Sequence, residues 1–256
     1  MPSAIRGDGF GVMMRMPNGR STTARLGLAA TLLALLTGTA AADEVYTYRV
    51  MHPTFGDVGT YVDRVSRSED GWQIVSKLHV VVRVIGIVVH REDADRTEVW
   101  RDGRLVRFQS VTTVNGDRYD VQGEARDNGF VVTAPTGVKV APPDVVPSEP
   151  WAARAARTSG SGVMMSTKTG KLETVENIRV EDSVIPVLGV EVPTRHYVIS
   201  TDKRQDVWKD ARGVPVLFRT SETFGAIDFV LVAETSTPDP AKAGSNGGGT
   251  IVGAHQ

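Results

Sequence analysis

Cysteine is absent from this chain of 256 residues. Its absence excludes disulfide bonds, a lipid anchor on an N-terminal cysteine, thiol catalysis and thiolate metal sites. The stability of the folded chain must therefore come from its core. The roughly 200 residues after the N-terminal segment are enough to form one such core, so we expect a single domain.

The chain also lacks an excess of charge of either sign. It holds 29 lysines and arginines against 30 aspartates and glutamates, a formal net charge of −1. Because residues 1–42 carry four arginines and one aspartate, the remainder of the chain is at −4. Nucleic-acid binding needs a basic face, and electrostatic attraction to a membrane surface needs a polybasic patch. We therefore expect no nucleic-acid partner.

Long apolar runs are scarce, and the N-terminal run, Leu26–Leu36, is too short to span a bilayer as a helix. Arg20 and Arg25 precede this run, and the small residues Ala40–Ala42 follow it. This order is typical of a secretory signal peptide. We expect residues 1–42 to be removed, and the mature protein to be periplasmic or secreted rather than integral to the membrane.

Helical periodicity is rare after residue 42, where Val, Thr, Tyr, Ile and Trp dominate and turn signals recur at short intervals. Asp102-Gly103 and Asn115-Gly116 are typical of type I′ hairpin turns. The pattern predicts an all-β, mainly antiparallel domain over residues 43–235, folded as a curved sheet or half-barrel. Residues 236–256 are rich in Pro, Ala, Gly and Ser and are predicted to be disordered.

Residues 134–162 break the strand pattern, because five prolines fall within them. Ser148 can cap a helix that has Pro150 in its first turn. We therefore predict one short helix, Trp151–Arg157.

An internal echo links Glu98–Asp102 with Asp206–Asp210, each with a central Trp and a following strand that ends in Phe. Two similar hairpins, with Trp100 and Trp208 against the core, explain the echo more simply than a duplicated half-domain.

The run from Val80 to Val89 is apolar at almost every position, with Arg83 as the exception. Its β-branched residues indicate a strand that is apolar on both faces, and Gly86 is the natural site of a bulge or bend. A buried guanidinium must reach solvent, pair with a carboxylate or meet an anionic ligand. The candidate ligand-binding residues of this run are Val82, Arg83, Val84, Gly86 and Val88.

Side chains that bind metals are densest at His90, Glu92, Asp93 and Asp95. A solvated hairpin end explains this cluster better than a metal site, because no second histidine has the spacing of a zinc-binding motif. The sequence therefore predicts no metal, no cofactor and no catalytic residue, and the chain is not expected to be an enzyme.

Five short segments of the sequence carry a resemblance to a known family: Tyr46–Val50, Trp100–Leu105, Asn115-Gly116, Arg195–Ile199 and Asp206–Asp210. On these segments the chain resembles a family of exported bacterial proteins of unknown function, and the resemblance covers most of residues 46–232. It implies a strand order similar to the curved half-barrel of periplasmic lipoprotein carriers and related lipid-handling proteins.

Two functions remain open at this point. A curved sheet with an apolar concave face could bind a lipid or another hydrophobic ligand. Alternatively, the chain could be a structural or envelope-associated protein with a filled core and no small ligand, whose second apolar face is covered by its own helix, Trp151–Arg157, or by another copy of the chain.

Overall fold

The computed structural model describes residues 43–152, 162–222 and 225–236. The predicted signal peptide, residues 153–157 of the predicted helix and residues 237–256 of the predicted tail lie outside these ranges. Among the described residues, no helix has the length and apolar character needed to cross a membrane.

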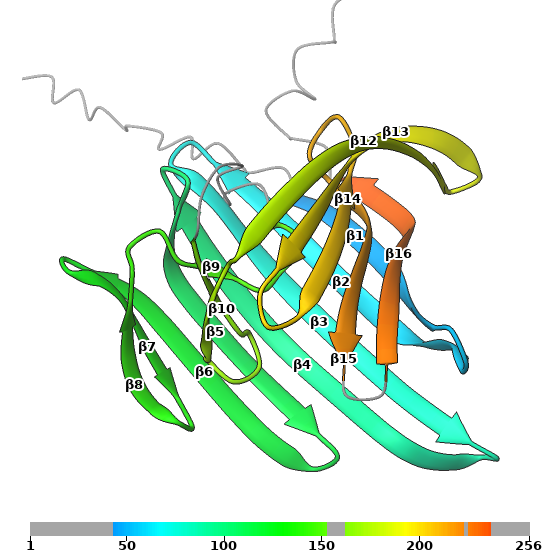
Figure 1. Cartoon of the computed structure of the whole chain (residues 1–256), viewed down its shortest axis with the longest axis horizontal. Helices are drawn as coiled ribbons and strands as arrows, with labels where there is room; N and C mark the ends of the chain where they lie inside the picture. The colour runs from blue at the N-terminus through cyan, green and yellow to red at the C-terminus, as the bar shows by residue number, and fades with distance from the viewer. Residues whose placement is uncertain (1–42, 153–161, 223–224, 237–256) are drawn as a thin grey trace, which may run out of the picture. The chain divides into compact units, whose positions relative to one another are not determined.

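One sheet of thirteen strands dominates the fold, and each strand is antiparallel to its neighbours (Figure 1). The spatial order is β12-β13-β14-β15-β16-β1-β2-β3-β4-β5-β6-β7-β8, so β12 and β8 are edge strands and the sheet is not closed into a barrel. The predicted all-β, antiparallel class is confirmed. The strands are β1 (Asp43–His52), β2 (Gly56–Ser68), β3 (Gly71–Val84), β4 (Ile87–Arg101), β5 (Arg104–Val114), β6 (Asp117–Arg126), β7 (Gly129–Ala134), β8 (Gly137–Ala141), β12 (Asn177–Val187), β13 (Val190–Ser200), β14 (Arg204–Lys209), β15 (Pro215–Glu222) and β16 (Gly225–Ser236).

The chain between β8 and β12 forms a crossover, and it carries a small second sheet. This sheet consists of β9 (Val146–Pro147), β10 (Val163–Met165) and β11 (Leu172–Thr174), with β9 parallel to β10. Met164 and Met165 are buried in a core cluster with Trp100, Phe108 and other residues of the large sheet. The crossover therefore packs on the large sheet and covers the part of its surface that bears Trp100 and Phe108.

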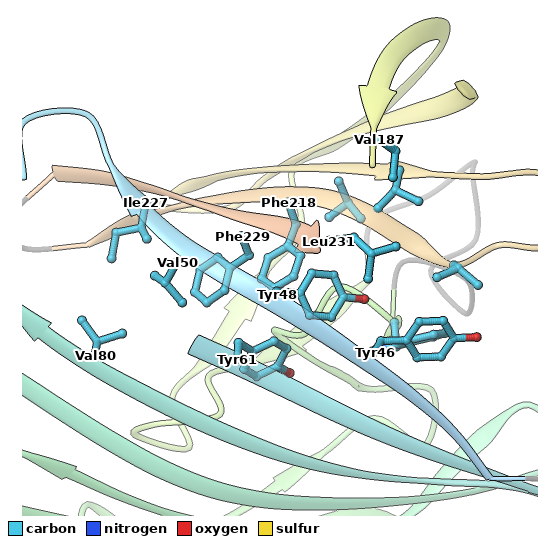
Figure 2. Close-up of a cluster of buried hydrophobic side chains, with 14 of the residues drawn as sticks. Tyr46, Tyr48, Val50, Tyr61, Val80, Val187, Phe218, Ile227, Phe229 and Leu231 are labelled. Atoms are coloured by element: carbon cyan, nitrogen blue, oxygen red, sulfur yellow. The ribbon is translucent and has the colours of Figure 1, made fainter. Parts of the chain in front are cut away.

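Most of the remaining core lies on one face of β14–β16 and β1–β3, where the large sheet curves. Tyr48, Tyr61, Phe218 and Phe229 form an aromatic cluster, with ring centroids 4.2–5.7 Å apart (Figure 2). The Tyr48 hydroxyl donates a hydrogen bond to the Pro215 carbonyl oxygen at 2.9 Å. We call the sheet face that bears these side chains the concave face.

The apolar run of residues 80–89 is a hairpin, not one bent strand. Ile85 and Gly86 have φ angles of 50° and 79°, as a type I′ turn requires, and they connect β3 to β4. The predicted hairpin end around Asp93 and Asp95 is therefore wrong, because both residues lie within β4. The positive φ of Gly86 serves a tight turn rather than a bulge. A bulge lies nearby, where Val82 pairs with His90 while Arg83 pairs with Val88.

The segment Ser148–Trp151, at the start of the predicted helix, consists of bends and turns. The echo is confirmed in part: both segments form hairpins, β4–β5 and β14–β15, and both tryptophans pack against core clusters, but to different extents. Trp100 is 1% exposed and stacks on Trp72 with ring centroids 5.2 Å apart. Trp208 is half-buried and lies on the strand face opposite the buried Val207. The two tryptophans are therefore not equivalent.

Candidate functional site

A cavity of about 140 Å³ lies on the concave face, between β2–β4, β14–β16 and the crossover. Its wall is apolar on one side and charged or polar on the other. The apolar lining residues are Leu78, Val80, Pro150, Val207, Phe218, Ile227 and Phe229, with the ring of Tyr61. The polar ones include Glu92, Arg96, Glu149, Thr167, Lys168, Glu173, Lys203, Gln205 and Thr220.

The apolar wall is rigid because its aromatic rings pack on one another. Phe218 and Phe229 are neighbours across β15 and β16 and stack with ring centroids 4.2 Å apart. Tyr61 meets both rings edge-on, at 5.7 and 5.6 Å. Leu78 and Val80 come from alternate positions of β3, which places both on the same face.

A buried ion pair marks the polar end of the cavity. Arg96 of β4 donates a hydrogen bond to Glu149 of the crossover, and Tyr61 donates another to the second oxygen of Glu149 at 2.8 Å. Burial lowers the pKa of Arg96, but Glu149 and other nearby acidic groups outweigh this effect and raise it. Arg96 therefore stays charged, and the pair joins the crossover to the large sheet.

A second ion pair lies closer to solvent. The Lys168 ammonium donates to the Glu92 carboxylate at 3.0 Å, and the Lys168 side chain is 27% exposed. Lys203, which also lines the cavity, is exposed. The charged side of the cavity therefore runs from the buried Arg96–Glu149 pair to the exposed Lys203, whereas most of the apolar lining is buried in the core.

Two further carboxyl groups lie in the core near this polar end. Burial raises the pKa of Asp63 to about 7, although Trp151 donates a hydrogen bond to it at 2.7 Å. Burial, with the nearby charge of Glu149, raises the pKa of Glu98 to about 8, and Trp100 donates to it at 2.8 Å. Near neutral pH, both groups therefore hold a proton for part of the time.

The residues that the sequence singled out do not line this cavity. Val82 is 1% exposed and belongs to the core, whereas Arg83, Val84, Gly86 and Val88 are exposed near the end of the β3–β4 hairpin. Their proposed ligand-binding role stays a prediction. The structure instead brings Leu78 and Val80, from the same strand, into the cavity.

The polar half of the cavity has a signal in the sequence, the spacing of the charged residues of β4. Glu92, Arg96 and Glu98 occupy alternate positions of β4, on the same face as the buried Ala94 and Trp100. Three charged residues on a face that also carries a buried Trp indicate paired charges in the interior. Glu149, the partner of Arg96, lies 53 residues away and has no comparable signal.

The cluster around His90 is divided between the two faces of β4. Asp93 accepts a hydrogen bond from Arg91 at 3.2 Å and contacts His79 at 2.6 Å, while Glu92 points into the cavity. Within the described ranges, no group of three or more His, Asp or Glu side chains is placed to bind a metal ion.

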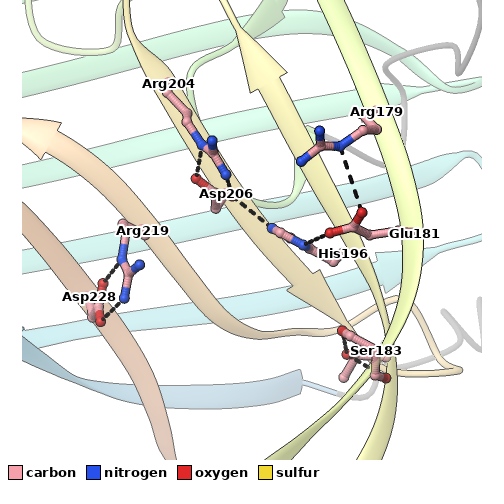
Figure 3. A network of polar contacts seen from close by, with 9 residues as sticks. Arg179, Glu181, Ser183, His196, Arg204, Asp206, Arg219 and Asp228 are labelled. Carbon is pink, nitrogen blue, oxygen red and sulfur yellow. Dashed lines mark hydrogen bonds and ion pairs between the residues drawn. The ribbon is translucent and has the colours of Figure 1, made fainter.

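A second polar network lies on the opposite face of the last strands (Figure 3). His196 lies between Glu181 and Asp206, with N···O distances of 3.0 and 2.7 Å, and it stacks on Trp208 at 4.0 Å. Burial raises the pKa of Asp206, but hydrogen bonds from Arg204 and His196 outweigh this effect and lower it. The network ties β12, β13 and β14 together and lies apart from the cavity lining.

The fold and the cavity define an all-β protein built on one large, open antiparallel sheet. Residues 48–232 match the model of a family described as a domain of unknown function, DUF6134, and the chain belongs to that family. A search of curated proteins finds no match.

A solved structure supports the fold assignment. The chain is similar to a β-barrel-like protein of a second domain of unknown function, DUF1849, from Brucella abortus, with a TM-score of 0.56. The two share 12% sequence identity, and the similarity covers 78% of this chain and 98% of the other.

Proposed function

We propose that the cavity on the concave face binds one slender amphiphile, with its apolar chain against Phe218 and Phe229 and its polar group near Lys168 and Lys203. The observation that carries this proposal is the division of the cavity wall into an enclosed apolar side and a charged side at the surface. Apolar pockets with a few placed polar groups are typical of small-molecule sites.

The cavity volume limits the ligand. About 140 Å³ is below the 300–1,000 Å³ of a typical small-molecule pocket, but it resembles an engineered apolar cavity of about 150 Å³ that binds benzene. We therefore infer that a single short acyl chain enters, while its head group stays at the mouth. Binding, rather than catalysis, is the role proposed.

A second candidate function is structural. The crossover covers part of the concave face, and its side chains Trp151, Met164 and Met165 fill core positions there. A chain that fills its own concave face in this way has little need of a ligand and could serve as an envelope-associated structural protein.

Calorimetric titration with octanoate and with 1-octanol separates the two functions. The ligand-binding function predicts saturable uptake of both probes, because both carry an apolar, unbranched chain of similar length. Leu78→Asp should abolish uptake, since it places a carboxylate in the apolar wall, whereas Val138→Asp, at a 66% exposed edge position, should leave uptake intact.

The polar end is tested by charge. Lys203→Gln should weaken the binding of octanoate more than the binding of 1-octanol. Lys139→Gln, on the exposed part of β8, should leave the binding of both probes unchanged. No saturable binding of either probe to the wild type would overturn the ligand-binding proposal and leave the structural function ahead.

A further inference from the structure

The end of the β3–β4 hairpin extends beyond the strands on either side of it. The pairing of β2 with β3 ends at Gly59 and Val80, and the pairing of β5 with β4 begins at Val114 and Glu92. Residues 81–91 therefore form a two-stranded ribbon, which we call the β3–β4 tip. A two-stranded hairpin alone is only marginally stable in water, so its neighbours at the base must hold it in place.

Asn115 of the adjacent turn fixes the base of this tip. Its backbone N–H donates to the Arg91 carbonyl oxygen at 2.9 Å, and its side-chain oxygen accepts a hydrogen bond from the Arg91 N–H at 2.8 Å. Beyond the Val82–His90 pair, three residues of β3 and the turn lead away from the core. At 3.3 Å per residue they reach ~10 Å.

The β3–β4 tip is apolar on both of its faces. Val84 pairs with Ile87, whereas Arg83 pairs with Val88, and successive pairs point to opposite faces. Each apolar residue of the tip beyond Val82 has a large exposed fraction: Val84 39%, Ile85 97%, Ile87 69%, Val88 49% and Val89 52%. Contiguous exposed apolar surface of this kind usually meets a partner or a membrane.

The turn residue Ile85 is also in an unfavourable conformation. Its φ of 50° lies in the left-handed region, where a β-branched side chain is strained. The same position in two other hairpins of this sheet is filled by Asp102 and Asn115, which tolerate that region. Because Ile85 is 97% exposed, hardly any packing within the molecule offsets the strain.

Both the charge and the shape of the β3–β4 tip favour a lipid surface as its occupant. Between Val80 and Arg91 the charged side chains are two arginines, beside one histidine, and the segment contains no carboxylate. The interfacial region of a bilayer surrounds every face of an inserted ribbon, which suits a tip that is apolar on both faces. The reach of ~10 Å also matches the 5–10 Å to which interfacial segments enter a membrane.

We propose that the β3–β4 tip inserts Ile85 and its apolar neighbours into the interfacial region of a lipid bilayer, with Arg83 and Arg91 at the phosphate level. Insertion is shallow, because the outward backbone N–H and C=O groups of a two-stranded ribbon must stay near water or head groups. Apolar contact drives it, since the chain has no net positive charge. The proposal is independent of the ligand cavity, whose lining includes none of residues 81–91.

Co-sedimentation with vesicles tests the proposal directly. The mature protein, residues 43–256, should bind vesicles of phosphatidylethanolamine and phosphatidylglycerol, and more weakly vesicles of phosphatidylcholine. Ile85→Asn should reduce partitioning about tenfold or more, because it removes the most exposed apolar side chain. The same variant should unfold at an equal or higher temperature, since Asn-Gly is the favoured pair in this turn.

Leu188→Asn provides a matched control. Leu188 has a φ of 51°, is 58% exposed and is followed by Gly189, but Asp182 and Glu191 lie on its hairpin. This variant should bind vesicles as the wild type does. Equal loss in both variants, or no loss in Ile85→Asn, would overturn the assignment to the β3–β4 tip.

The absence of cysteine allows a second, independent readout. An environment-sensitive fluorophore on Ile87→Cys should shift to the blue when vesicles are added, whereas the same label on Val190→Cys should not. These positions are 69% and 64% exposed and each follows a turn glycine. The label at residue 87 could instead shift to the blue in the absence of vesicles, by an amount that increases with protein concentration. That result would show self-association and refute the proposal.

Discussion

At the scale of single residues, two buried acids give this protein an unusual dependence on pH. Asp63 and Glu98 have pKa values raised to about 7 and about 8, mainly by burial. Between the ordinary carboxyl pKa and these values, the folded state binds more protons than the unfolded state. The free energy of unfolding must therefore fall as pH rises across this window, and the loss is complete above it.

Asp63→Asn should remove one part of that dependence. The amide keeps an oxygen for the hydrogen bond from Trp151 and never ionises. At pH 8 we expect the variant to be more stable by on the order of 2–4 kcal/mol, whereas near pH 4 the two proteins should be similar. Urea unfolding at both pH values measures the difference.

Asp120→Asn is the control for this prediction, because Asp120 is exposed and Arg118 lowers its pKa. It should not stabilise the protein at pH 8. A stability of the wild type that rises steadily from pH 5 to pH 8 would contradict the ionisation assigned to Asp63 and Glu98.

Turn residues show where sequence patterns suffice and where they fail. Asp102-Gly103 and Asn115-Gly116 mark their hairpins correctly, because these residues tolerate positive φ. Ile85-Gly86 forms the same turn without that signature, so the run around it resembles one long strand. For the same reason, the sequence pattern places the turn wrongly in the Asp-rich segment of β4.

At the scale of elements, the two Trp hairpins differ although their sequences are alike. Strand parity fixes which residues share a face, but the sequence does not say which face the crossover covers. Trp100 lies under the crossover and is 1% exposed, whereas Trp208 stacks on His196 on the other side of its strand.

This difference predicts unequal losses of stability. Trp100→Ala should cost about 3–5 kcal/mol, as is usual for a buried Trp, and it also leaves Glu98 without its hydrogen-bond donor. Trp208→Ala should cost clearly less, because its side chain is half-buried. Chemical unfolding of both variants tests this, and equal losses would argue for equivalent hairpins after all.

At the scale of the whole molecule, the sequence was sufficient for the class of fold but not for its site. Antiparallel strands and hairpins follow from local residue patterns. The cavity, in contrast, depends on contacts between distant segments, such as Tyr61 with Glu149 and Phe218. Such contacts require the sheet to curve strongly between β15 and β2, which no local pattern encodes.

The central claim is that this curved sheet leaves a cavity that accepts one acyl chain. Native mass spectrometry of the protein mixed with octanoate tests it most directly. The account predicts a complex of one octanoate per chain in the wild type and its loss in Leu78→Asp. An absence of any complex in the wild type, or an equal amount in both proteins, would contradict it.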